Sequence, residues 1–264
     1  LGVNIENIQL YDHSTNDCWC RDHGPDFLIK NSEKIILNWQ YNSWGEKYPP
    51  YDLDNGIPNK VAQSLGLDRL DIPMVLEGGS FDINGNGVLM TTKSCLLKEN
   101  RNPQYSPNQI ENYLKEYLRQ NEVIWLEEGI RGDDTDGHID DISRFVNKET
   151  IITSVCEQEN LNYETLENNK KVLADSLGDR FEIIDLLMPK PLFFSGNEVP
   201  ASYANFYIAN DIVIVPIFND SNDNEALDIL KECFPERNIV GVDSSKIIYG
   251  LGSFHCLSKQ EPKV

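Results

Sequence analysis

The spacing of hydrophobic positions predicts four helices along the chain. Behind Ser106-Pro107, a capping residue and a proline suited to a first helical turn, apolar residues recur at 110, 113, 114, 117 and 118. The same period predicts helices over 59–65, 163–177 and 224–234, which end beside Gly66, Gly178 and Pro235.

Short apolar runs follow each predicted helix and have the length of strands. These runs cover 72–76, 123–126, 181–187 and 239–242. Two hairpins are also expected, with 79–83 joined to 88–92 by Asn84-Gly85-Asn86-Gly87, and 203–209 joined to 212–217 by Asn210-Asp211. A further strand is predicted at Ile8 to Tyr11.

The helix, strand and hairpin pattern repeats. Helices begin near 59, 106, 163 and 224, and a period of roughly 50 to 60 residues is typical of repeat arrays and propellers. The plainer alternative is an α/β domain in which helices and strands alternate without a repeat. We predict a five-fold pseudosymmetric α/β propeller in which residues 1–264 form a single domain. The first unit lacks its helix, so we expect residues to precede Leu1 in the native chain.

Polar, glycine-rich segments stand at equivalent places in the predicted units. A closed array of five units would bring them together on one axis. They are Trp19 to Pro25, Leu76 to Gly79, Asp134 to Asp140, Ser195 to Glu198 and Gly250 to Cys256.

Composition narrows the choice of partners. The chain has 264 residues, 40% of them hydrophobic, with no apolar run of membrane-spanning length and no basic leader. We therefore expect a cytoplasmic protein that does not enter a membrane and whose six cysteines are reduced thiols. A net charge of −20 disfavours nucleic acid and favours small cations, although acidity can also serve solubility alone. A homo-oligomer is compatible with these features.

Several residues offer chemistry, although none is specific alone. Separated by one residue, His138 and Asp140 would face the same side of an extended segment, which can serve a metal site, a general base or a guanidinium pocket. One histidine among carboxylates suits a divalent metal less well than several histidines would, and the plain alternative is a solvated acidic loop. Cys256 follows a glycine-rich loop and is a nucleophile or a buried core thiol. Glu77 ends a predicted strand, and Asp22 either serves a site or pairs with Arg21.

Taken together, these residues suit a guanidinium substrate. Two carboxylates bind a planar cation in fork geometry, a thiolate can attack its central carbon, and one histidine can donate and later accept a proton. This chemistry requires no metal and no cofactor.

Six segments of the chain resemble the agmatine deiminase and bacterial peptidyl-arginine deiminase family of the guanidine-modifying superfamily. They span most of the sequence in the expected order. The segments are Trp19 to Pro25, Glu77 to Asp82, Cys95 to Pro103, Asp134 to Val146, Ser202 to Tyr207 and Phe254 to Cys256.

The resemblance implies the five-fold propeller and a set of site residues. By this resemblance Cys256 is the nucleophile, and His138, oriented by Glu77, is the acid and base. Asp22 and Asp140 would hold the guanidinium. Substrate-binding positions would be Trp19, Asn205 and Asp136.

The implied activity is hydrolysis of agmatine to N-carbamoylputrescine and ammonia, within polyamine biosynthesis. The loop Gly250-Leu251-Gly252 departs from the family's run of three glycines, which puts the recognition of the substrate tail in question. Three alternatives stay open: deimination of free or peptidyl arginine, a metal-dependent hydrolase built on His138, and a non-catalytic protein that binds polyamines.

Overall fold

The computed structural model describes residues 5–264, and four of the five sheets in this part of the chain are built to one plan. In each sheet the first strand pairs antiparallel with the second, a helix follows, and the third strand pairs parallel with the second. The units are β1 (Asp26–Lys30), β2 (Glu33–Gln40), α4 (Ile57–Leu65) and β3 (Asp68–Val75); β4 (Phe81–Ile83), β5 (Val88–Thr92), α6 (Pro107–Tyr117) and β6 (Glu122–Leu126); β7 (Ser143–Phe145), β8 (Thr150–Val155), α7 (Tyr163–Leu177) and β9 (Glu182–Leu187); and β12 (Tyr207–Ile208), β13 (Ile212–Ile217), α8 (Asp223–Cys233) and β14 (Asn238–Asp243).

Shorter elements connect the units. One additional two-stranded sheet pairs β10 (Leu192–Phe194) with β11 (Asn197–Val199). Single turns of α-helix are α1 (Cys20–His23), α3 (Asp52–Asn55) and α5 (Lys93–Leu96), and α2 (Ser43–Glu46) is a single turn of left-handed backbone. Turns of 3-10 helix cover Ile5–Asn7, Ile139–Asp141, Gly178–Arg180 and Ile247–Gly250.

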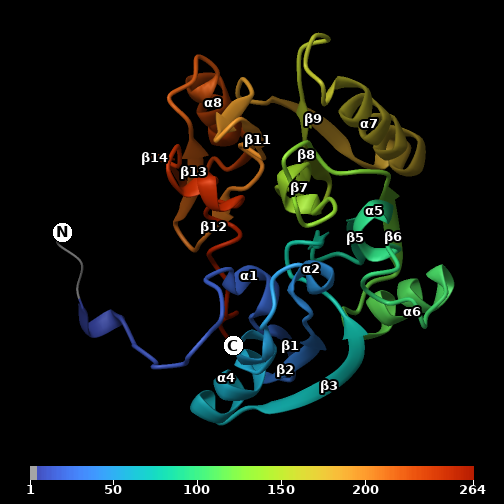
Figure 1. Cartoon of the computed structure of the whole chain (residues 1–264), viewed down its shortest axis with the longest axis vertical. Coiled ribbons are helices and arrows are strands. Elements are labelled where there is room, and N and C mark those ends of the chain that lie inside the picture. Colours follow the sequence, from blue (N-terminus) through green and yellow to red (C-terminus); the bar gives the residue numbers. More distant parts are fainter. Residues whose placement is uncertain (1–4) are drawn as a thin grey trace.

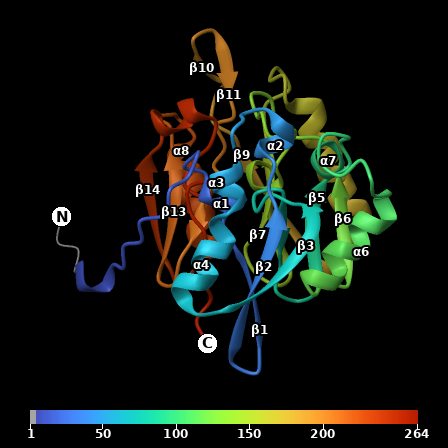
Figure 2. The same ribbon diagram turned by 60° about the horizontal axis from the view of Figure 1, so that its bottom comes forward.

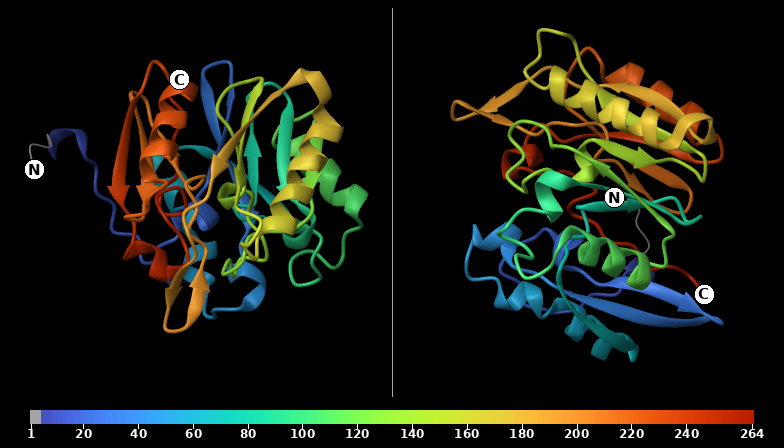
Figure 3. Two further views of the ribbon diagram at one scale, coloured as in Figure 1. Left: turned by 90° about the horizontal axis from the view of Figure 1, so that it is seen from above. Right: turned by 90° about the vertical axis from the view of Figure 1, so that its right-hand side faces the viewer.

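The long helices lie at the outside of the molecule, while α1, α2 and β12 lie nearer its middle (Figure 1). Figure 3 shows the same arrangement from two other sides, with α7 and α8 each covering a sheet. The β10–β11 hairpin projects from one end of the molecule (Figure 2). The architecture is a mixed α/β fold, and no sheet formed by residues 5–264 is closed.

The four predicted helices are confirmed, and local sequence explains where they begin and end. Ser106 and Gln109 form a reciprocal capping box ahead of α6, with proline in the first turn. Gly66 ends α4 in the left-handed conformation, at φ 65°, which a side chain would strain.

Two features of the chain differ from the expectation. Ile8 to Tyr11 is not a strand, because no other strand lies beside it to accept its hydrogen bonds; Leu10 is 88% exposed. Ser195 and Gly196, expected near the site, instead form the turn of the β10–β11 hairpin, where both have positive φ.

The sequence reading also missed the hairpin between β1 and β2. Its turn is made by Asn31 and Ser32, at φ 52° and 64°, so it has the geometry of a two-residue hairpin turn without the glycine that usually signals one.

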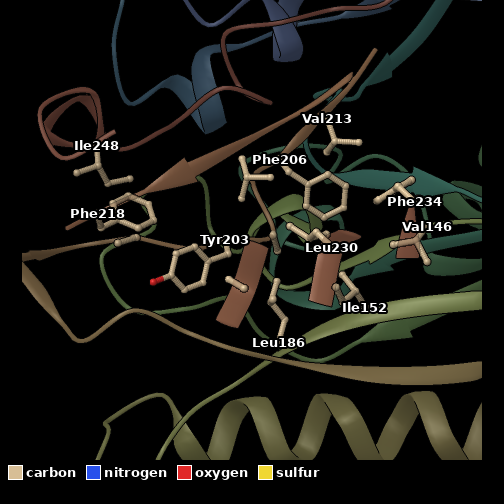
Figure 4. Packing of buried hydrophobic residues seen from close by; sticks show 14 of the residues in the cluster. Val146, Ile152, Leu186, Tyr203, Phe206, Val213, Phe218, Leu230, Phe234 and Ile248 are labelled. Atoms are coloured by element: carbon tan, nitrogen blue, oxygen red, sulfur yellow. The ribbon is translucent and has the colours of Figure 1, made fainter. Parts of the chain in front are cut away.

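Apolar residues gather into three clusters between the sheets and their helices. In the cluster of the fourth unit, Tyr203 and Phe206 are almost fully buried among residues of β13 and α8 (Figure 4). These two aromatic side chains anchor the segment that carries Asn205 between them. Over the described part of the chain, no helix has the length and apolar character needed to cross a membrane.

Candidate active site

A pocket of about 200 Å³, called here the Cys256 pocket, opens where several connecting segments meet. Three carboxylates and four aromatic side chains contribute to it, and among residues 5–264 no lysine or arginine lines it. The lining residues are Asp17, Trp19, Asp22, Trp44, Tyr48, Asp134, Thr135, Tyr249, Gly250, Leu251, Gly252 and Cys256.

Cys256 follows the 3-10 turn Ile247–Gly250 and is 8% exposed. Asn205 donates from Nδ2 to the sulfur at 3.0 Å, and the thiol lies 3.7 Å from Oδ2 of Asp140. Burial, followed by the charges of Asp140 and Asp141, raises the pKa of the thiol well above its ordinary value. Burial and these charges therefore favour the protonated thiol, and a cation in the pocket would favour the thiolate.

Asn205 fixes both the thiol and its loop. Its side-chain oxygen accepts from the backbone N–H of His255 at 3.1 Å, and its Nδ2 also donates to Asp141 at 2.9 Å. The side chain of Asn205 is thus bonded on both ends and positions Cys256.

Asp22 and Asp140 approach each other beside Gly79. A Cβ atom at Gly79 would lie 2.9 Å from Oδ1 of Asp22 and 3.1 Å from Oδ2 of Asp140. It would also lie 2.6 Å from Nδ1 of His138, so only glycine leaves these three groups room to converge.

Each of the two aspartates is held in place by fixed donors. Asp22 accepts from the backbone N–H of Gly79 at 2.9 Å and from Nε1 of Trp44 at 3.1 Å. Asp140 shares a 2.6 Å contact with Nδ1 of His255 through Oδ2, while its buried Oδ1 has no partner within the described residues. Burial raises the pKa of Asp140 to about 7. The free oxygen is available to accept an N–H group from a ligand.

His138 is buried between two carboxylates. Nδ1 lies 3.7 Å from Asp22, and Nε2 lies 3.8 Å from Glu77. Burial opposes protonation, but the charge of Asp22 and contacts with Cys95 and Glu77 outweigh it, so the pKa of His138 lies well above its ordinary value. The imidazole is therefore suited to donate a proton.

His138 and Asp140 do not lie on an extended segment, as the sequence argument assumed. Asp140 lies within the 3-10 turn Ile139–Asp141, and His138 is the extended residue before it. The tight turn directs both side chains toward Gly79.

Glu77 is fixed by a buried arginine. Arg101 donates from Nε to Glu77 at 2.8 Å, with both side chains fully buried. Burial works against ionisation of Glu77, but the charge of Arg101 and the contact with His138 lower its pKa to about 2. Glu77 is therefore a carboxylate that can stabilise protonated His138.

Asp136 is not brought into the Cys256 pocket. Its carboxylate pairs with Lys47 at 2.9 Å, with Arg101 at 2.5 Å and also with Lys98. It therefore contributes by holding the arginine that binds Glu77. Its φ of 73° turns the side chain into this cationic cluster.

Aromatic side chains form the walls of the pocket. The edge of Trp19 packs against Gly250 and Gly252, where a Cβ atom would lie within 2.9 Å and 2.7 Å of the indole. Between them, Leu251 has a φ of 68°, so it holds the left-handed conformation that glycine adopts more readily than a residue with a side chain.

Trp44, which the sequence reading missed, lies in a left-handed turn. Ser43, Trp44, Gly45 and Glu46 all have positive φ, between 52° and 85°. Asn42 stabilises the turn by accepting from Gly45. Tyr48 follows and donates to Asp134 at 2.5 Å. In the sequence, Trp44 stands out only as a tryptophan that precedes a glycine and lies near acidic segments. No periodic pattern of apolar residues includes it, so the sequence does not place it at this pocket.

One group of side chains has the composition of a metal site. Glu77, Cys95 and His138 offer ligand atoms that all lie within 4.8 Å of one another. Glu77 is already paired with Arg101 at 2.8 Å, and a divalent cation would add positive charge beside that guanidinium. The donor set therefore does not fit a metal well.

The structure brings together seven of the residues expected in the site. Asp22, Glu77, His138, Asp140, Asn205 and Cys256 are connected through the contacts described above, and Trp19 lines the Cys256 pocket together with Asp22 and Cys256. Arg144 pairs with Asp82 at 3.2 Å and lies over Phe206. Asp22 does not pair with Arg21.

Solved structures that share this fold include two agmatine deiminases. The structure of an agmatine deiminase from C. jejuni with substrate bound superposes with a TM-score of 0.91 at 37% identity, covering 96% of this chain and 76% of that one. An Enterococcus faecalis agmatine deiminase gives 0.91 at 35% identity, covering 96% and 77%. An amidinotransferase from Microseira wollei shares the fold alone, at 13% identity and a TM-score of 0.55.

The sequence comparison identifies the family. The profile of the Porphyromonas-type peptidyl-arginine deiminases matches residues 2–262, and the chain belongs to this family. A curated relative from Latilactobacillus sakei, provisionally named an agmatine deiminase, is 36% identical over 97% of this chain and 78% of its own length.

Proposed function

We propose that this protein is an agmatine deiminase, which hydrolyses the guanidinium of agmatine to N-carbamoylputrescine and ammonia. The observation that carries the proposal is the site at the Cys256 pocket. The thiol of Cys256 and Asp22 line a cavity that draws no lysine or arginine from the described residues, and Asp140 and the buried His138 converge with Asp22 beside Gly79. The similar structures from C. jejuni and Enterococcus faecalis, both named agmatine deiminases, support it.

The guanidinium of the substrate would bind between Asp22 and Asp140. The free Oδ1 of Asp140 can accept one N–H group, and both carboxylates bind the planar cation by charge-assisted hydrogen bonds. The positive charge then offsets the negative field that raises the thiol pKa, and Cys256 becomes a thiolate beside the guanidinium carbon.

The chemistry proceeds in two halves. Sulfur forms a bond to the guanidinium carbon, and a proton from His138 allows ammonia to leave, which gives an S-alkyl thiouronium intermediate on Cys256. His138, now neutral, takes a proton from water as the water oxygen attacks the same carbon. The C–S bond breaks as the hydroxyl of the adduct loses its remaining proton to solvent, the urea product leaves and the thiolate returns.

Small cationic substrates are favoured by the charge of the pocket. Asp17 and Asp134 line it together with Asp22, so a second positive charge on the substrate is attracted to it. The α-carboxylate of free arginine would require a cationic partner, and the lining drawn from the described residues supplies none. This favours agmatine over arginine and over the arginyl peptides suggested by the family's name.

The first test is ammonia release from agmatine, with free arginine and an arginyl peptide as parallel substrates. Samples treated with iodoacetamide and with EDTA run beside the untreated protein. We expect release from agmatine that is lost on alkylation and unaffected by EDTA. The Cys233→Ser variant, which removes a cysteine of α8, is the control. Iodoacetamide should abolish its activity to the same extent as that of the unchanged protein.

Other outcomes would redirect the assignment. Release from arginine or the peptide alone would make the protein a deiminase of those substrates. Sensitivity to EDTA without sensitivity to alkylation would indicate a metal-dependent hydrolase, and binding of agmatine without turnover would indicate a polyamine-binding protein.

We also propose that the units belong to a single-domain propeller with five-fold pseudosymmetry. The support is the common strand order of four sheets and the meeting of their connecting segments at the Cys256 pocket. An experimental structure of the natural protein tests this, and a fifth unit of different strand order would contradict it.

A further inference from the structure

A second pocket, called here the Arg21 pocket, has a volume of about 430 Å³ and shares no lining residue with the Cys256 pocket. The first strand of each of the four units contributes to it. Its apolar wall is made by Phe27, Leu28, Phe81, Ile83, Phe145, Tyr207 and Ile208. Two guanidinium groups, those of Arg21 and Arg144, also line it.

Arg21 is a buried cation without a carboxylate partner. The residue is 3% exposed; Nε donates to the carbonyl of His255 at 3.2 Å and Nη1 to Gln260 at 2.7 Å. Nη2 is buried and has no hydrogen-bond partner among residues 5–264. Arginine is almost never this buried unless its charge is paired, because removing the charge from water is costly.

The other charges of the pocket are already paired. Asp82 pairs with Arg144 at 3.2 Å, and Asp26 pairs with Lys259 at 2.7 Å. Asp82 also accepts from the backbone N–H of Phe145 at 2.7 Å, which fixes its orientation. One positive charge is therefore left over, that of Arg21.

We propose that the Arg21 pocket binds a small monocarboxylate with an apolar body, whose carboxylate accepts a hydrogen bond from the unpartnered Nη2 of Arg21. The planar guanidinium matches a carboxylate in geometry, and an anion here would supply the counter-charge that Arg21 lacks. A single unpaired cation between two aspartates favours a monoanion over a phosphate dianion. The aromatic and aliphatic walls favour a short alkyl chain over a bare ion.

The test uses butyrate as the probe, with butyramide as its uncharged isostere at the same ionic strength. Calorimetric titration and the thermal midpoint of the folded protein are measured for both, without any substrate. We expect saturable binding and a rise in midpoint with butyrate, and neither with butyramide. Because no turnover is needed, this test can fail while the deiminase assignment stands, and the reverse also holds.

Variants locate the binding site. We expect Arg21→Gln to raise the Kd for butyrate about tenfold or more, because it removes a charge-assisted bond. Ile83→Glu, on the 40% exposed rim, should raise Kd several-fold by repulsion, whereas the matched Ile29→Glu, at a 49% exposed position outside the lining, should not.

Several results would overturn the proposal. Equal binding of butyrate and butyramide, a folded Arg21→Gln protein with unchanged Kd, or tighter binding of inorganic phosphate than of butyrate would each do so. If Arg21→Gln does not fold, the Ile83→Glu and Ile29→Glu pair decides, and equal Kd values for that pair count against the site.

Discussion

The Cys256 pocket and the Arg21 pocket take neighbouring residues from the same two segments, yet they differ in which charges are left unpaired. Asp22 and Cys256 line the first, while Arg21 and His255 line the second. Among the described residues, three carboxylates and no lysine or arginine line the Cys256 pocket, whereas two arginines and two aspartates line the Arg21 pocket and Arg21 alone of these has no charged partner. A step of one residue along the backbone therefore places the carboxylate of Asp22 in one cavity and the guanidinium of Arg21 in the other.

The pairing of the aspartates differs in the same way. In the Arg21 pocket, Asp26 and Asp82 are both bound to cations, at 2.7 and 3.2 Å. In the site beside Gly79, Asp140 keeps an oxygen without a partner. The net charge of −20 does not distinguish these two environments. A carboxylate can bind a cationic ligand only if one of its oxygens is still free to accept a hydrogen bond.

The largest effect should come from the nucleophile. Cys256→Ser should lower ammonia release from agmatine by about 10³-fold or more, because a hydroxyl is a far weaker nucleophile near neutral pH. Thermal unfolding should change little, since the two side chains are similar in size. Near wild-type turnover in this variant would show that Cys256 is not the nucleophile. The Cys256 pocket would then no longer differ from the Arg21 pocket by being the site of catalysis.

Asp140→Asn should have the next largest effect. Loss of a buried charge-assisted contact of about 3 kcal/mol corresponds to roughly 100-fold in kcat/KM. Steady-state kinetics with agmatine measures it, and an unchanged kcat/KM would show that Asp140 does not hold the substrate.

The pH dependence should follow the ionisation of Asp140. Its pKa is raised to about 7, so the carboxylate that binds a cation forms only as pH rises through that value. We expect kcat/KM to fall roughly tenfold per pH unit below about 7. The Asp140→Asn variant should lose this acid limb; an identical limb in both proteins would assign it to another group.

The smallest effect concerns the substrate tail. Asp134→Asn should raise the KM for agmatine about fivefold, as expected for a partly exposed ion pair near 1 kcal/mol. The KM for butylguanidine, which lacks the second cation, should not change. Asp52→Asn, at the start of α3 and outside the pocket, is the control; an equal shift with both substrates would argue against charge recognition.

Local signals predicted the helices well, because caps such as Ser106 and end residues such as Gly66 act within one turn. The seven residues that gather around the pocket carried recognisable motifs. Trp44 and the open Nη2 of Arg21 could not be predicted, since their positions depend on contacts between segments far apart in sequence. Asp136 was misplaced because its partners, Lys47 and Lys98, lie outside its own motif.

The left-handed turn at Ser43–Glu46 has a kinetic consequence. Each of its non-glycine residues costs about 1–2 kcal/mol in this conformation, so the turn depends on contacts made elsewhere, such as the bond from Trp44 to Asp22 and that from Asn42 to the carbonyl of Asn100. During refolding these partners must assemble first. We therefore expect catalytic competence to return after the far-ultraviolet circular dichroism signal, with this wall of the pocket ordering last.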